Sequence, residues 1–163
     1  MIFSIVGQLL LGWLAADVFT GVFHWWEDNF GNEKWPILGA WLIAPQQLHH
    51  IDPLAFTRHG FWARNGASII ASILAGAGLA AIFGPSFFIL ALIVGTALSN
   101  EVHRFAHQPS QASKPIRVLQ EIGILQSARG HAKHHRPPYQ ANYCVLTDWT
   151  NAVINAFRGL PSS

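Results

Sequence analysis

The sequence predicts an all-α integral membrane protein with about three transmembrane helices, a short interfacial segment and a helical cap. Only 11% of the 163 residues are charged, whereas soluble domains carry about 25%. Long uncharged runs separate polar segments that hold all the histidines. Seven tryptophans suit a protein with extensive membrane–water boundaries, where indole rings are enriched. The length fits one domain, which we expect to cover residues 1–163.

The first predicted transmembrane helix covers residues 2–23. This segment is apolar apart from Asp17, and a bilayer crossing takes about 20 helical residues. It lacks the basic N-terminal region that a signal peptide shows. We therefore expect a retained membrane helix.

The second and third predicted spans form a hairpin, residues 66–83 and 86–107. Residues 66–99 contain no charged side chain, and Gly84-Pro85 supplies a turn in the middle. Pro85 suits the first turn of the later helix. An earlier apolar run, residues 37–44, is too short to span and predicts an interfacial or re-entrant segment.

Residues 24–65 and 108–163 form the predicted cap. Ser113 and the following Pro115 are typical of a helix start. Pro137 and Pro138 end the helix that carries the preceding histidines. A last short helix is expected from about Asp148 to Gly159.

Three crossings place the polar segments on one side of the membrane. All nine histidines fall on that side, as do all ten lysines and arginines. Cytoplasmic segments of membrane proteins carry an excess of Lys and Arg, so we expect this side to be cytoplasmic. The single cysteine, Cys144, excludes a disulfide within the chain.

The histidines form recurring short patterns that are typical of a metal site. His103 and His107 are four residues apart, which places them on one face of a helix. His49 and His50 are adjacent, and on a helix the directions of adjacent side chains diverge by about 100°. The two rings could therefore bind different ions. Nine imidazoles exceed what one ion can use, and two ions are expected. The candidate ligands are His24, His49, His50, His59, His103, His107, His131, His134 and His135.

Carboxylates near the histidines are too few for a site built mainly from glutamates. We expect Asp28 and Asp52 to orient imidazole N–H groups, although both could be solvated loop acids. Asp17 lies at membrane depth, where an acid is costly, so a functional partner is expected for it.

The excess of histidines favours oxidation over hydrolysis. Hydrolytic zinc needs only three protein ligands and an open position, whereas attack on an unactivated C–H bond requires a strong oxidant made from O₂. The first interpretation is therefore an enzyme that oxidises a lipid chain with O₂. Two alternatives stay open: an enzyme that hydroxylates the lipid, and a metal-binding protein that is not an enzyme. Residues 66–99 contain no His, Asp or Glu, which argues against metal transport.

Four motifs resemble a known family. They are Asp17-x-x-x-Gly21-x-x-His24-Trp25-x-x-Asp28, His49-His50-Ile51-Asp52-Pro53 with Thr57-Arg58-His59, Asn100-x-x-His103-x-x-x-His107, and His131-x-x-His134-His135. In these four motifs the sequence resembles a family of membrane lipid desaturases. The family includes the plasmanylethanolamine desaturases and the plant plastid phosphatidylglycerol desaturases.

The resemblance implies a di-iron centre with the nine histidines as ligands and Asn100 beside the metals. It also implies O₂ as co-substrate, a membrane phospholipid as substrate, and a separate ferredoxin- or cytochrome b5-like electron donor. The first candidate product is the vinyl ether bond of a plasmalogen, made from an alkyl ether phospholipid. The alternative is a double bond in an acyl chain of phosphatidylglycerol, toward which Pro137-Pro138 and Asn142-Tyr143-Cys144 lean.

Overall fold

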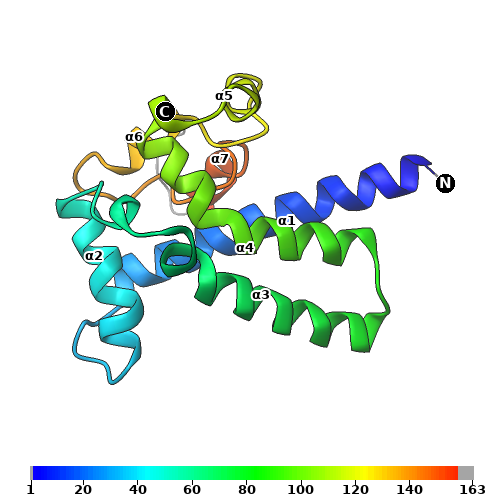
Figure 1. The fold of residues 1–163 in the computed structure, drawn as a ribbon, viewed down its shortest axis with the longest axis horizontal. Helices are drawn as coiled ribbons and strands as arrows, with labels where there is room; N and C mark the ends of the chain where they lie inside the picture. Colours follow the sequence, from blue (N-terminus) through cyan, green and yellow to red (C-terminus); the bar gives the residue numbers. More distant parts are fainter. Residues whose placement is uncertain (1, 158–163) are drawn as a thin grey trace.

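The computed structural model describes residues 2–157, and these form helices and no strands. Three long helices run side by side, and the short helices gather at one end of them (Figure 1). This confirms the predicted all-α class. Arg158 and the expected helix end at Gly159 lie outside the described residues.

The long helices are α1 (Ile2–Phe30), α3 (Phe61–Phe83) and α4 (Phe87–His107), and α4 contacts both of the others. By length and apolar composition, α1 and α3 are long enough to cross a membrane. Their apolar side chains face outward: Phe3 is 90% exposed and Ile82 74%. Outward-facing apolar surface of this extent fits a lipid environment. A third crossing by α4 stays a prediction, because its last two turns are polar.

Two of the predicted helix boundaries were too narrow. Helix α1 continues seven residues beyond Phe23, through a polar segment, because His24 and Glu27 lie on a buried face of the same helix. Helix α3 begins at Phe61 instead of residue 66. In α1 the polar last turns are covered by the short helices, whereas Arg64 and Asn65 at the start of α3 are held by hydrogen bonds to Glu101 of α4.

The turn between α3 and α4 is built differently from the prediction. Gly84 has φ +79°, a conformation that favours glycine. Ser86 is the N-cap of α4, and its hydroxyl accepts a hydrogen bond from the Ile89 amide at 3.2 Å. Pro85 therefore precedes the cap and is not in the first turn of α4.

Small residues bring α1 and α4 into close contact. A Cβ atom on Gly12 would lie 2.3 Å from the carbonyl oxygen of Phe88, and one on Gly95 would lie 2.6 Å from Cβ of Ala16. Close backbone approach at small residues is the usual way in which membrane helices pack. These contacts fix α1 against α4 over the half of α4 that precedes its histidines.

The predicted interfacial segment forms a π-helical turn, η1 (Gly39–Ile43), that runs directly into α2 (Ala44–Ile51). Trp41 and Ile51 point outward, whereas His49 is buried. The remaining elements are η2 (Phe56–Arg58), η3 (Pro109–Gln111), α5 (Lys114–Glu121), α6 (Ala128–His134) and α7 (Asn151–Phe157). Ser113 takes the expected N-cap position of α5, although its side chain makes no capping hydrogen bond.

Candidate metal centre

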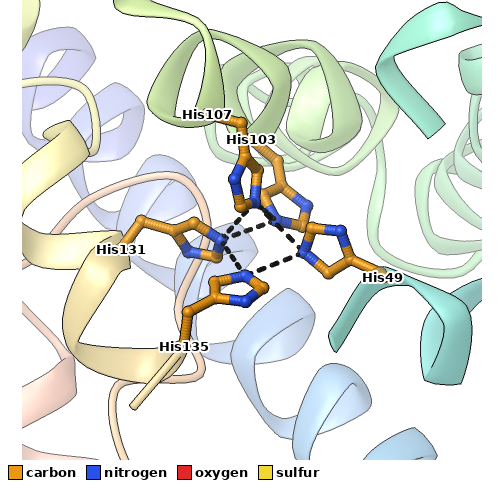
Figure 2. A group of neighbouring side chains, drawn as sticks. All are labelled: His49, His103, His107, His131 and His135. Carbon is orange, nitrogen blue, oxygen red and sulfur yellow. Dashed lines mark hydrogen bonds between the residues drawn. The ribbon is translucent and has the colours of Figure 1, made fainter. Parts of the chain in front are cut away.

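Five histidines from three helices converge on one point. Figure 2 shows their rings turned toward one another, with the dashed lines joining Nε2 atoms. The Nε2 separations are 2.9 Å for His103–His131, 3.1 Å for His103–His107 and 3.0 Å for His49–His135. The first group thus consists of His49, His103, His107, His131 and His135.

Hydrogen bonding alone does not account for this first group. A neutral imidazole has a single N–H, yet two or three other Nε2 atoms lie within 3.1 Å of each Nε2 atom in this group. A metal–nitrogen bond of about 2.1 Å places neighbouring ligands of an octahedral ion about 3.0 Å apart. Six of the ten Nε2 separations among these rings run from 2.7 to 3.1 Å. The donor set and its spacing therefore fit one transition-metal ion.

A second group lies directly beside the first. It consists of His24, Asp28, His50 and His134, whose potential ligand atoms lie within 4.8 Å of one another. The Asp28 carboxylate is 3.0 Å from Nε2 of His50 and 3.5 Å from Nε2 of His134. The Asp28 carboxylate thus lies among the potential metal ligands. From the sequence we expected it only to accept a hydrogen bond from an imidazole N–H group.

Single motifs contribute to both groups. His49 belongs to the first group and its neighbour His50 to the second, as the divergence of adjacent rings on a helix suggests. His131 and His135, one helical turn apart, face the first group, and His134 faces the second. Rings of the two groups are in contact, with centroids 6.1 Å apart for His24 and His103.

Two backbone carbonyl groups orient rings of the second group. Nδ1 of His24 lies 2.9 Å from the Tyr143 carbonyl oxygen, and Nδ1 of His134 lies 3.0 Å from that of Ala141. Because a carbonyl only accepts, Nδ1 carries the proton in both rings. The Nε2 lone pair is then directed at the group, which is the usual arrangement for ligating histidines.

Gln46 is a member of this site that sequence reasoning missed. Its side-chain amide lies 2.6 Å from Nε2 of His24 and 3.1 Å from the Asp28 carboxylate. The amide nitrogen of Gln46 donates to this carboxylate, because a carboxylate only accepts. The available signal was its position on α2, one helical turn before His49 and His50.

Asp17 holds the loop beyond the second group. Its carboxylate is fully buried and accepts hydrogen bonds from the backbone amides of Leu146 and Thr147. The hydroxyl groups of Thr147 and Thr150 donate to it at 2.7 and 2.5 Å. The partner of Asp17 is therefore the segment 146–150, which follows Tyr143 in the chain. Asp17 affects His24 only through this loop, because the Tyr143 carbonyl holds the His24 ring.

Two predicted site residues lie apart from both groups. His59 is exposed, and its carbonyl oxygen accepts a hydrogen bond from Arg64. Asp52 pairs with Arg58 on the surface. Neither side chain is among the nine that converge.

Asn100 also lies outside the two groups. Its amide donates to the Arg64 carbonyl at 2.8 Å, which links α4 to α3. Beside it, Glu101 accepts hydrogen bonds from Arg64 and Arg104 at 2.8 Å each. These contacts brace the helices just below the first group.

Burial keeps the imidazoles of the cap neutral. Desolvation, and then the neighbouring rings, lower the pKa of His49, His131 and His134 far below the ordinary value near 6.5. The same causes lower the pKa of His135 to about 4. Metal ions bind the neutral form of imidazole, so these rings are ready to bind at neutral pH.

The chain is similar in sequence to known lipid desaturases. A family model described as "Lipid desaturase domain" matches residues 13–160. The chain is 32% identical to plasmanylethanolamine desaturase of Myxococcus xanthus, 29% to plasmanylethanolamine desaturase 1 of Mus musculus, and 37% to the chloroplastic fatty acid desaturase 4-like 1 of Arabidopsis thaliana. These matches cover 98%, 93% and 91% of this chain, but only 59%, 62% and 52% of the relatives. No solved structure matches.

Proposed function

Because this chain belongs to the lipid desaturase domain family, we propose that it is an O₂-dependent di-iron enzyme that desaturates a membrane lipid close to its headgroup. The first candidate product is the vinyl ether bond of a plasmalogen, formed from an alkyl ether phospholipid. Two relatives are named plasmanylethanolamine desaturase, and they match nearly the whole chain. The observation that carries the proposal is the convergence of eight imidazoles and Asp28 in two adjoining groups.

The reaction removes one hydrogen from each of two neighbouring carbons and forms a C=C bond. One O₂ is reduced to two waters by these two hydrogens together with two electrons and two protons. The electrons come from a separate ferredoxin- or cytochrome b5-like donor. Iron bound in the two groups would supply the O₂ chemistry, which protein side chains alone do not provide.

The protein's own residues bind, orient and shield. The first group offers five nitrogen donors, and the second offers three nitrogens and one carboxylate. Carbonyl groups of Ala141 and Tyr143 fix two of the rings. His49, His131 and His134 are almost fully buried, which keeps bulk water away from the first group and from the boundary between the groups.

The position of the site fits a bond near a headgroup. His103 and His107 end α4, and His24 lies in the last two turns of α1. We propose three membrane crossings, by α1, α3 and α4, with both histidine groups at the cytoplasmic boundary. A lipid chain held against these helices would then present its headgroup-proximal carbons to the site.

One observation favours an acyl chain as the alternative substrate. Among the relatives compared, the Arabidopsis fatty acid desaturase 4-like 1 has the higher identity, 37%, over 91% of this chain. A lipid hydroxylase would use similar ligands and differs in its product. The mass of the product separates these reactions, because desaturation removes two hydrogens and hydroxylation adds an oxygen.

Lipid mass spectrometry tests the proposal. A host that lacks plasmalogens would express the wild type, His135→Ala or His59→Ala, with alkyl ether lipids supplied. We expect a vinyl ether lipid with the wild type and with His59→Ala, and none with His135→Ala. A wild type that binds zinc but no iron in iron-rich medium, and leaves all lipids unchanged, would favour a non-enzymatic metal-binding protein.

A further inference from the structure

A solvent-facing depression adjoins the second histidine group. Its volume is ≈ 300 Å³. Asp28 and His50, both members of that group, form part of its wall. Asn29, Gln47 and Tyr139 form further parts, and Asn29 is exposed to solvent. The second group is therefore within reach of small molecules from outside the membrane.

The two histidine groups differ in how many coordination positions a bound metal ion would have left for small molecules. Five imidazoles fill all but one position of a six-coordinate ion, and no residue of the first group lines the depression. The second group supplies four donor atoms. Sites with few histidine and carboxylate ligands keep positions open for exchangeable ligands. The open positions and the depression thus belong to the same group.

The wall of the depression selects for small polar molecules. Among the described residues it contains amides, two phenol rings and the Asp28 carboxylate, but no lysine or arginine. The Tyr139 ring packs against that of His50, with centroids 4.8 Å apart, so Tyr139 lies on the wall directly beside the second group. Such a wall offers hydrogen bonds to water-sized ligands and neither a counter-charge for phosphate nor an apolar path for a lipid tail.

We propose that this depression is the exchange port through which water, hydroxide and similarly small anions reach the second metal ion. The lipid would approach from the membrane side, whereas water formed in the reaction would leave through the port. The proposal rests on the metal site of the proposed function and adds to it the route and the class of exchangeable ligand.

Azide binding to the purified, iron-loaded protein tests the port. Azide is a small anionic ligand, and its binding to ferric iron is followed by optical and electron paramagnetic resonance spectra. Gln47→Trp should fill the depression and weaken or slow azide binding at least about tenfold, with iron content unchanged. Tyr139→Ala should widen the depression and speed azide binding.

The control is Ala152→Trp, which fills a separate depression between α6 and α7. It should leave azide binding unchanged. Azide binding that is equally fast and tight in the wild type, Gln47→Trp and Tyr139→Ala would overturn the port. Absence of iron from the wild type would instead overturn the proposed function, so the two failures are distinguishable.

Discussion

At the scale of single residues, the site depends on which nitrogen of each histidine faces inward. The Ala141 carbonyl takes the Nδ1 proton of His134, so Nε2 of that ring is free to bind a metal ion. The same holds for His24 and the Tyr143 carbonyl. A change to one of these rings should therefore affect one ion more than the other.

His134→Ala should lower the iron content from about two to about one per chain, because it removes a donor from the second group only. His59→Ala is the matched control, since His59 is exposed and outside both groups. Elemental analysis of the purified proteins measures the effect. Two irons retained in His134→Ala would show that this ring is not a ligand.

Gln46→Leu should weaken iron binding in the second group about 10- to 100-fold, the usual effect of losing a polar neighbour of metal ligands. Gln47→Leu is the control, because Gln47 reaches only the Gly31 carbonyl, at 3.5 Å. Titration of the metal-free proteins with Fe²⁺ compares them. Equal affinity in Gln46→Leu and Gln47→Leu would exclude a role for Gln46.

The histidine patterns predict the members of the site better than the polar residues around them. Eight of the nine predicted histidines converge, and for His103 and His107, and for His131, His134 and His135, the spacing matches a helical turn. His59 does not, since it follows η2 and no helical repeat directs its ring. Asp28 was predicted only as a residue that orients an imidazole, and Gln46 was not predicted at all, because their places in the site depend on how α1 and α2 cross. The partners of Asp17 lie about 130 residues away in the chain.

At the scale of elements, the loop of residues 141–150 supports the second group. Asn142 and Asn155 form two reciprocal hydrogen bonds, at 3.1 and 2.7 Å, which tie the loop to α7. Asp17 ties the far end of the loop to α1. The carbonyl groups that orient His24 and His134 lie at the start of this loop.

Asp17→Ala should destabilise the protein by about 3 kcal/mol, because it leaves buried amides and hydroxyls without an acceptor. Asp17→Asn keeps one oxygen for the backbone amides, and the threonine hydroxyls can rotate to accept, so a loss of about 1 kcal/mol is expected. Thermal unfolding in detergent measures both. Equal melting temperatures for Asp17→Ala and the wild type would contradict the anchoring role.

The packing of α1 against α4 gives a second prediction at this scale. Gly12→Val should destabilise the helix pair by about 1–3 kcal/mol, because its side chain would collide with the Phe88 carbonyl. Gly78→Ala is the control, since nothing lies within 4 Å of a Cβ atom there. Unfolding of both variants in detergent tests the contact. An unchanged Gly12→Val would show that the two helices are not in close contact at that point.

For the helices too, features that depend on neighbouring residues are predicted from the sequence, and features that depend on distant contacts are not. The all-α class and the order of the three long helices follow from uncharged runs and helical spacing, which are local properties. The extension of α1 to Phe30 does not, because its polar last turns are stabilised by contacts with the cap. The π-helical turn before α2 likewise has no local signature in Gly39–Ile43.

At the scale of the whole molecule, eight imidazoles lie together in two adjoining groups. In the metal-free protein those of His131, His134 and His135 have lowered pKa values and are neutral at pH 7. Below about pH 6.5 the unfolded chain takes up protons on these histidines, but in the folded chain the pKa of His135 is about 4 and those of His131 and His134 are far below normal. Stability should therefore fall as the pH is lowered through this window.

Melting temperatures of the metal-free protein at pH 7.5 and pH 5 test this expectation. We expect a clearly lower value at pH 5, and release of iron from the loaded protein over the same range, since protons and metal compete for the rings. A melting temperature that does not change with pH would mean that the imidazoles are already accessible to water.

The central claim is that two metal ions lie side by side at one end of the long helices. Anomalous X-ray diffraction at the iron absorption edge locates such ions directly. We expect one peak enclosed by the Nε2 atoms of the first group and a second peak among His24, Asp28, His50 and His134. A single peak, or peaks away from these side chains, would contradict the account.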